Sequence, residues 1–264
     1  MASFKVVMDW HTHTRYSDGR GTVKDNVRAA AEKGLTEIAI TDHGPKGIFI
    51  GVKSAETYLD IRKDIEALKE RYPVRVLLGA EANVTGLNGE IDIPPKISKE
   101  MDILLVGLHP QAIAGSWREN LGWMLPNFLG RVNQTLKKSM RNANTKALVN
   151  AMYNHPVNVA THPGLMMDVD LDEIARASSA TGCAVEINAG HAYNKDEVIK
   201  AALRWAAPLA VNSDAHYPDT VGEVDKGVKL LLKWDVPVNQ VLNAVPVSAR
   251  QEVHPSDIIE NKVH

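Results

Sequence analysis

The sequence predicts an α/β fold in which about seven parallel strands alternate with helices around a barrel. Three observations favour this fold. Apolar runs of strand length recur along the 264 residues, amphipathic segments separate them, and polar side chains able to bind metal follow many of the runs. Near-continuous apolar strands are typical of parallel sheets covered on both faces. Because a parallel barrel carries its chemistry where the strands end, we expect a site at the C-terminal ends of the strands.

Seven apolar runs are expected to be strands: residues 4–10, 35–41, 74–80, 102–108, 157–161, 183–188 and 208–212. Five segments between them are expected to be helices: residues 22–33, 54–71, 170–181, 194–206 and 219–233. Ser54, with Glu56 nearby, and Asn194 are typical of residues that begin helices. Gly34 and Gly182 stand where helices should end before the next strand.

Two segments interrupt this alternation. Residues 83–99 contain a Pro-Pro pair and are expected to form a hairpin or a loop. Residues 110–153 are long for one crossover and are rich in Arg and Lys between residues 118 and 146. This basic stretch is either a solvated helix face or a lid that recognises substrate over the mouth of the cleft. No repeat or linker divides the chain, so residues 1–264 are expected to form a single domain.

The bulk composition is that of an ordinary globular protein, with 44% hydrophobic and 23% charged residues. A net charge of −2 provides no global attraction to nucleic acid or to an anionic membrane. The single cysteine, Cys183, lies in an apolar run and is expected to be a packed core thiol. The first residues lack the apolar run of a signal peptide, and no run is long enough for a membrane span. We therefore expect a cytoplasmic protein.

Nine side chains that can bind metal lie at or near the ends of the expected strands. They are His11, His13, Asp18, His43, Glu81, His109, His162, Asp214 and His216. A single histidine more often packs or hydrogen-bonds than binds metal. The recurrence of such residues at one strand end after another is the stronger signal, because all these ends open on one face of a barrel. We expect the nine side chains to meet in one cleft.

The ligand types restrict the metal. Imidazole and carboxylate groups without thiolates favour Zn²⁺, Mn²⁺ or Fe²⁺. Nine ligands exceed the needs of one ion and suit three divalent ions when one carboxylate bridges two of them. The sequence does not choose among the three metals.

The order of the motifs HTH, YSDG, TDHG, GAE, LHP, THPG and SDAH resembles that of the polymerase and histidinol phosphatase (PHP) family. The resemblance runs from Asp9 to about His216 and is close to the domain fused to bacterial family-X DNA polymerases. It implies a distorted (β/α)7 TIM-like barrel with a trinuclear metal site. It also assigns the ligands to three ions: His11, His13, Glu81 and Asp214 to the first, Glu81, His109 and His162 to the second, and Asp18, His43 and His216 to the third.

The resemblance implies a metal-dependent phosphoesterase. A hydroxide held between the ions that Glu81 bridges would attack phosphorus in line, because cations lower the pKa of bound water and neutralise phosphate charge. His191 is a candidate general acid or a contact to the leaving group, with a surface role as the alternative. Asp42 is either a carboxylate that orients an imidazole or a turn residue. Glu81 and Asp214 are expected to be essential for catalysis.

Phosphate binding also needs cationic side chains. Arg15 and Lys46 lie in loops that follow the first and second expected strands, and Arg118 lies in the basic stretch after the fourth. These three are the expected substrate-binding residues, although loop Arg and Lys side chains are usually only solvated. His155, His254 and His264 fall outside the pattern, and no role is expected for them.

The expected substrate is a phosphomonoester of a small metabolite or nucleotide. One alternative is histidinol phosphate, although the NAGHAYN stretch lacks the arginine expected there for that substrate. A second is the 3′ end of a nucleic acid, which the net charge disfavours. A third is a silent PHP domain that only binds metal or a partner. A metal barrel that hydrolyses amides or lactones is a fourth, because the same hydroxide attacks carbonyl carbon. The oligomeric state is open.

Overall fold

The computed structural model describes residues 4–247. Its main sheet has seven parallel strands in the order β2-β3-β4-β5-β6-β7-β8, so neighbours in the sequence are also neighbours in space. The strands are β2 (Met8–Asp9), β3 (Glu37–Ile40), β4 (Arg75–Asn83), β5 (Ile103–Gly107), β6 (Val159–Ala160), β7 (Ala184–Asn188) and β8 (Leu209–Asn212). The predicted seven-stranded parallel arrangement is confirmed.

The sheet curls into a nearly closed barrel because the chain segments after β2 and β8 meet. Thr12 and Ala215 form an isolated parallel bridge there. The amide of His13 donates to the carbonyl of Ala215 at 2.8 Å. Closer to the strands, the amide of Trp10 donates to Oδ1 of Asn212 at 3.1 Å. This seam places the first and last candidate ligands of the sequence next to each other.

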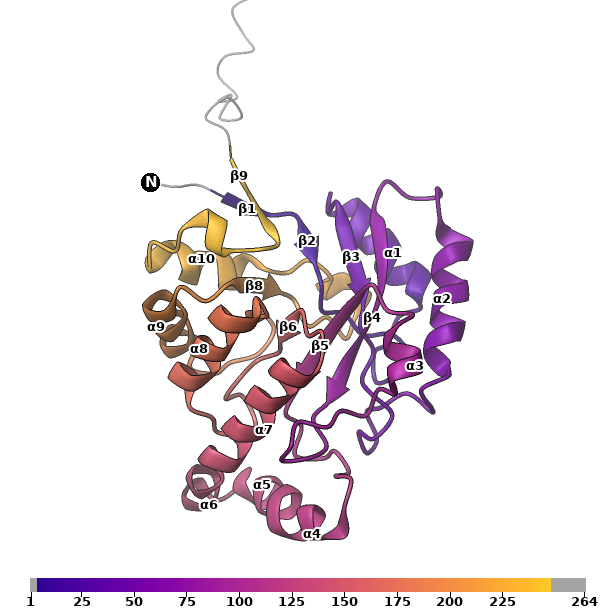
Figure 1. Ribbon diagram of the computed structural model, residues 1–264. Coiled ribbons are helices and arrows are strands. Elements are labelled where there is room, and N and C mark those ends of the chain that lie inside the picture. The colour runs from indigo at the N-terminus through magenta and orange to yellow at the C-terminus, as the bar shows by residue number, and fades with distance from the viewer. Residues whose placement is uncertain (1–3, 248–264) are drawn as a thin grey trace, which may run out of the picture.

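The predicted strand over residues 4–10 is wrong in one respect, because this run is divided between two sheets. β1 (Phe4–Val6) pairs antiparallel with β9 (Ala244–Pro246), which was not predicted, and only β2 joins the barrel. The division falls at Val7, whose amide donates to the carbonyl of Asn243 at 3.2 Å. Figure 1 shows this two-stranded sheet at the end of the barrel opposite the helices α4 to α6.

Five of the helices correspond to the predicted segments. They are α1 (Val23–Glu32), α2 (Thr57–Leu68), α8 (Leu171–Thr181), α9 (Lys195–Trp205) and α10 (Asp225–Lys233). Gly182 ends α8 with a left-handed backbone (φ 78°), as predicted. The predicted helix start at Ser54 is wrong, since α2 begins at Thr57 and its N-cap, Glu56, makes no side-chain capping bond. Asn194 does precede α9, also without a side-chain capping bond.

The predicted helix over residues 219–233 begins too early. A 3₁₀ turn, η2 (Pro218–Thr220), and the left-handed Gly222 (φ 73°) come before α10. The amide of Gly222 donates to Oδ2 of Asp9 at 2.8 Å, which ties this loop to the first barrel strand. Residues 213–224 therefore form a structured loop at the rim of the barrel rather than the start of a helix.

The two unusual segments lie on the same side of the barrel. Residues 84–91 form a hairpin closed by a Val84–Ile91 bridge and are followed by α3 (Pro95–Ser98), in agreement with the prediction. After β5 come α4 (Trp117–Glu119), the π-helix η1 (Asn120–Met124), α5 (Leu125–Gly130), α6 (Gln134–Ser139) and α7 (Arg141–Asn154). Helices α4 to α6 project beyond the carboxyl ends of β4 and β5, and α7 returns along the barrel (Figure 1).

The interior of the barrel changes character along its axis. Inward-facing side chains from the N-terminal ends to the middle of the strands are apolar: Ala39, Leu77, Ile103, Leu105, Val159, Ala184 and Ala210. Alternation along a strand keeps later residues on the same inward face, so Glu81 of β4 and Glu186 of β7 also point inward. A second, larger apolar core lies between the strands and the surrounding helices. No helix in residues 4–247 is long and apolar enough to cross a membrane.

Candidate metal centre

All nine predicted ligands converge at the C-terminal end of the barrel. Their donor atoms fall into four overlapping groups in which every atom lies within 4.8 Å of the others. The groups are His13, Asp18, His43 and His216; His11, Glu81 and His162; His11, His13 and Asp214; and His43, Glu81 and His109. We call these nine residues the rim cluster.

Glu81 is at the centre of the rim cluster. Its Oε2 atom lies 3.2 Å from Nε2 of His11 and 2.9 Å from Nδ1 of His43. Its Oε1 atom lies 3.3 Å from Nε2 of His109 and 2.9 Å from Nε2 of His162. The sequence placed Glu81 just after a strand, whereas β4 extends to Asn83 and holds the carboxylate rigidly within the sheet. One carboxylate thus contacts imidazoles from four other segments of the chain.

Asp214 and Asp18 connect the remaining imidazoles. Oδ1 of Asp214 lies 3.2 Å from Nε2 of His13 and 3.5 Å from Nδ1 of His216. Asp18 lies 3.4 Å from Nε2 of His216 and 3.8 Å from Nε2 of His43. Asp18 and His216 are partly exposed, while the rest of the rim cluster is buried. The arrangement is deep on the Glu81 side and open to solvent on the Asp18 side.

Several buried donor atoms lie within ion-pair distance of one another, yet they lack the hydrogen bonds that burial normally requires. Among residues 4–247, eight buried side-chain nitrogen or oxygen atoms have no hydrogen-bond partner, and six belong to the rim cluster. They are Nε2 of His11, both ring nitrogens of His13, Nδ1 of His43, Oε2 of Glu81 and Nε2 of His109. Unpartnered buried polar groups are costly unless something else satisfies them. These residues therefore fit divalent cations.

The protonation states in the metal-free protein follow from burial and mutual contact. Burial would raise the pKa of Glu81, but the imidazoles of His11 and its neighbours outweigh burial and hold it well below its usual range. Burial, together with the nearby His43 imidazole, lowers the pKa of His13 to about 3. The Asp18 carboxylate outweighs burial and raises the pKa of His216 to about 9. His13 is thus neutral, while metal binding to His216 must displace a proton.

A second layer of polar residues orients the ligands, and sequence analysis did not identify it. Oε1 of Glu186 lies 2.7 Å from Nδ1 of His11, and its Oε2 accepts from the amide of His162 at 2.9 Å. Oδ1 of Asn83 lies 2.8 Å from Nδ1 of His109. These contacts aim the opposite nitrogen of each ring at the rim cluster. Glu186 lies at an inward position in the run CAVEIN, so its alternation with apolar neighbours was the available signal.

The side chain of Asp42 has a role that neither expectation described, because it binds the loop that follows β2. Its side chain accepts from the amide and hydroxyl of Thr14, each at 2.7 Å, and from the hydroxyl of Ser17 at 2.5 Å. The carboxylate therefore fixes the loop that carries Asp18. Burial raises the pKa of Asp42, and these hydrogen bonds oppose that rise.

Two rim residues have a left-handed backbone that side chains other than glycine rarely adopt. His162 has φ 30° and Asp214 has φ 55°, and each lies shortly after a short barrel strand. Asp214 is held by Nδ2 of Asn188, which donates to its Oδ2 at 2.7 Å. Strained backbone that the surrounding structure enforces is common at functional sites.

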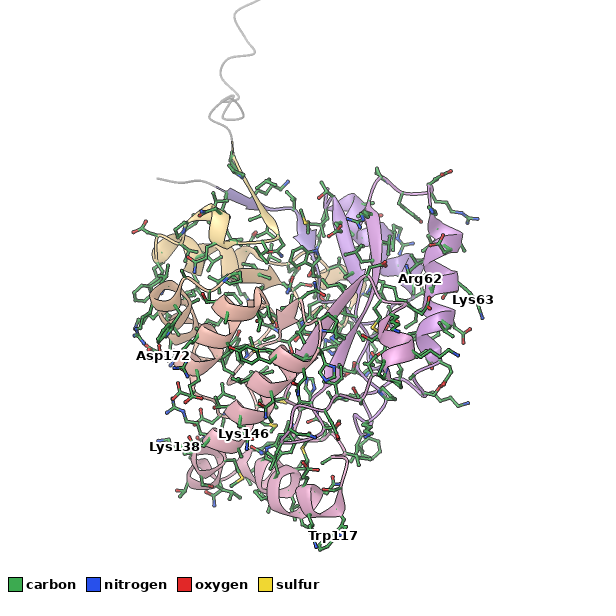
Figure 2. The ribbon with its side chains drawn as sticks, viewed as in Figure 1. Arg62, Lys63, Trp117, Lys138, Lys146 and Asp172 are labelled. Carbon is green, nitrogen blue, oxygen red and sulfur yellow. The ribbon has the colours of Figure 1, made fainter. Side chains whose placement is uncertain are left out.

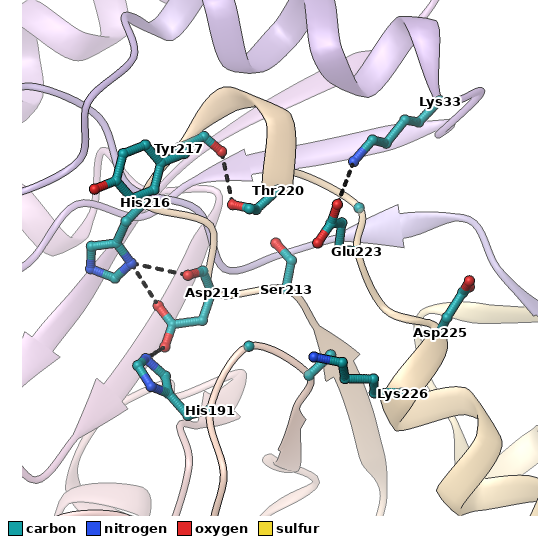
Figure 3. Close-up of a pocket in the computed structure, with 13 residues that line it drawn as sticks. Lys33, His191, Ser213, Asp214, His216, Tyr217, Thr220, Glu223, Asp225 and Lys226 are labelled. Atoms are coloured by element: carbon teal, nitrogen blue, oxygen red, sulfur yellow. Dashed lines mark hydrogen bonds and ion pairs between the residues drawn. The ribbon is translucent and has the colours of Figure 1, made fainter.

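A cavity of about 630 Å³ opens beside the rim cluster, as Figure 3 shows. Asp214, His216 and His191 form one side, and Glu223, Asp225 and Lys226 form the other. His191 is 45% exposed, and its Nε2 lies 3.2 Å from Oδ2 of Asp214. The structure thus brings His191 to the edge of the rim cluster, where a bound molecule can reach it.

The three predicted substrate-binding cations do not line this cavity. Arg15 is exposed and lines a separate cavity with Tyr16 and Asp64. Lys46 is exposed, and its amide donates to Asp92 at 2.9 Å. Arg118 lies over the ring of Trp117, with 5.5 Å from its guanidinium carbon to the ring centroid. Figure 2 places Trp117 at the tip of the projecting helices.

The chain resembles known proteins over most of its length. It is 30% identical over 251 residues to a protein named probable phosphatase from Thermoanaerobacter sp. (strain X514), with 90% of this chain and 91% of that protein covered. A protein named probable phosphatase from Proteus mirabilis (strain HI4320) is 30% identical over 249 residues, with 90% of each covered.

A solved structure with the same fold is histidinol phosphate phosphatase from Lactococcus lactis subsp. lactis Il1403, complexed with zinc, L-histidinol and phosphate. Its TM-score is 0.59 at 17% identity, covering 86% of this chain and 93% of that one. The model of the PHP domain matches residues 9–226, a span that begins in β2 and ends in α10 and includes the whole rim cluster. The chain therefore belongs to the PHP family.

Proposed function

We propose that this chain hydrolyses phosphoric monoesters of small molecules, using three divalent ions held by the rim cluster. The observation that carries the proposal is the burial of unpartnered imidazole nitrogens around the Glu81 carboxylate, an arrangement suited to cations. Family membership and the relatives named probable phosphatases support the reaction class. The whole rim cluster is present, which disfavours a silent domain.

By resemblance to the family, the ligands would be shared among three ions. His11, His13, Glu81 and Asp214 would hold the first, Glu81, His109 and His162 the second, and Asp18, His43 and His216 the third. Nitrogen and carboxylate donors without thiolates suit Zn²⁺, Mn²⁺ or Fe²⁺. When bound, such ions acidify water and neutralise charge on a phosphate ester. The bound zinc of the Lactococcus phosphatase is consistent with zinc here.

The chain's own residues supply positioning and a proton. Glu186 and Asn83 hold the His11 and His109 rings in one orientation. We assign to His191 the role of proton donor to the departing alkoxide oxygen, because its ring reaches the cavity from the edge of the rim cluster. Arg15, Lys46 and Arg118 stay predicted substrate contacts.

Two narrower substrates remain as alternatives. Histidinol phosphate is supported by the likeness to the Lactococcus phosphatase, but the loop after β7 (Ala189, Gly190, His191, Ala192, Tyr193) has no arginine. A nucleic-acid 3′ end is supported only by the basic residues of the 110–153 segment, while the net charge of −2 opposes it. A steep loss of activity with rising salt would favour the nucleic acid.

The test is phosphatase activity before chelation, after chelation and after return of Zn²⁺, Mn²⁺ or Fe²⁺, measured on a panel of phosphorylated metabolites. We expect chelation to abolish turnover and a metal ion to restore it. His11→Ala should be inactive under every condition, whereas His155→Ala, a histidine outside the rim cluster, should behave like the wild type. A folded, metal-loaded protein that hydrolyses no ester of the panel would favour the silent domain.

A further inference from the structure

The cavity beside the rim cluster is larger than one phosphate group needs. At about 630 Å³ it is in the range of pockets that enclose a whole small ligand. It extends from Asp214 and His191 to the start of α10, and Thr220 and Tyr217 form part of its wall. A phosphate bound at the rim cluster would therefore leave room in this cavity for the remainder of its molecule.

The far side of the cavity carries a positive charge without a partner. Figure 3 shows Lys226 reaching from the start of α10 into the cavity, with its amine toward Ser213 and Asp214. Within residues 4–247, this amine has neither an ion pair nor a hydrogen bond, in contrast to Lys33, which lies 3.9 Å from Glu223. Asp225 lies next to Lys226 in the sequence, but Figure 3 shows its carboxylate directed away from that amine.

A second cation lies behind the first. Lys195 begins α9 and is buried, and its amine donates to the carbonyl of His191 and lies 5.2 Å from the centroid of the Tyr193 ring. Burial lowers the pKa of Lys195, and the nearby charge of Lys226 lowers it further. Neither lysine has a carboxylate ion pair within the described chain. The positive charge of Lys226 at the cavity wall, reinforced by this buried lysine, favours an anion in the cavity.

We propose that this cavity receives a second anionic group of the substrate, bound to Lys226 while the ester phosphate occupies the rim cluster. Preferred substrates then carry a carboxylate or a second phosphate besides the phosphate that is hydrolysed. This inference rests on the proposed phosphatase function and specifies its substrate class. Lys226 thereby becomes the residue that distinguishes substrates with two anionic groups from substrates with one.

The experiment compares matched ester pairs on metal-loaded protein. Glycerol 3-phosphate is compared with 3-phosphoglycerate, and ribose 5-phosphate with ribose 1,5-bisphosphate, so that the two pairs distinguish a carboxylate from a phosphate. We expect kcat/KM to be about tenfold higher for the member with two anionic groups in at least one pair, as expected for one charge-assisted hydrogen bond. Lys226→Met should bring that ratio close to one, and Lys226→Arg should restore part of it.

Lys229→Met, on the same helix and outside the cavity lining, is the matched control and should keep both the ratio and the rates of the wild type. A Lys226→Met variant that lowers both members of each pair equally overturns the inference and leaves the phosphatase function standing. If no ester is hydrolysed, the phosphatase function fails, and binding decides the inference instead. Phosphonoacetate should then raise the melting temperature of the metal-loaded protein more than ethylphosphonate, and equal shifts overturn the inference.

Discussion

The two ends of the barrel interior are built on the same strands and serve opposite purposes. At the N-terminal end, Leu77, Ile103 and Ala184 point inward and form an apolar cluster. At the C-terminal end, the same inward faces present Glu81 and Glu186 among histidines. The apolar end gains stability from burial, whereas the polar end buries groups that lack partners within the protein. Function is thus separated from stability along one axis.

The largest effect should come from the centre of the rim cluster. Glu81→Gln preserves shape but removes the charge that faces four imidazoles, so kcat/KM should fall on the order of 10³-fold or more. Steady-state kinetics and circular dichroism measure activity and fold. Activity near the wild-type level would show that the polar end of the barrel does not hold the catalytic centre.

His191→Asn tests the edge of the rim cluster, at the same C-terminal end of the barrel. If His191 donates a proton to the leaving group, turnover of an alkyl phosphate should fall about 10²-fold. A p-nitrophenyl ester, whose leaving group needs no proton, should be affected far less. An equal loss on both esters would contradict the proton-donor role and indicate a binding or positioning role instead.

Glu186→Gln tests the polar residues that orient the metal ligands. Because Glu186 contacts both the His11 ring and the amide of His162, its neutralisation should weaken metal affinity by roughly 10–100-fold. Competition with a chromogenic chelator measures this affinity. Unchanged affinity would mean that the rings hold their orientation without this carboxylate.

Leu77→Ala at the apolar end should have the opposite signature. The side chain is buried inside the barrel, so its truncation should cost about 2–5 kcal/mol of unfolding free energy. Activity per folded molecule should stay close to that of the wild type. Urea denaturation and kinetics on the same preparation report both quantities, and a large loss of kcat at full folding would break the separation between the two ends.

Sequence patterns were sufficient to predict the strands that belong to the barrel sheet alone and the side chains whose chemistry is unusual for a strand end. Glu81, for instance, follows an apolar run and has no structural reason to be buried, so its membership of the rim cluster was predictable. The division of residues 4–10 was not, because β1 depends on pairing with β9, more than 200 residues away in the chain. The start of α10 at Asp225 depends in a similar way on the long-range bond between Gly222 and Asp9.

The supporting residues of the site were equally hidden from sequence reasoning. Asp42 was expected either to orient an imidazole or to be a turn residue, yet its carboxylate binds the loop of Thr14 and Ser17. Glu186 and Lys226 carry no motif, and their positions become meaningful only when β7 and α10 are placed beside the rim cluster. Loop cations such as Arg118 were chosen for their charge and for their place after a strand, and neither property determines where a long side chain points.

Metal content is the most direct test, because everything depends on imidazoles and carboxylates sharing cations at one end of the barrel. Elemental analysis of purified and of reconstituted protein should give about three divalent ions per wild-type chain and fewer for Glu81→Gln. Wild-type protein that is fully folded but takes up no more divalent ion than the His11→Ala variant would contradict the account.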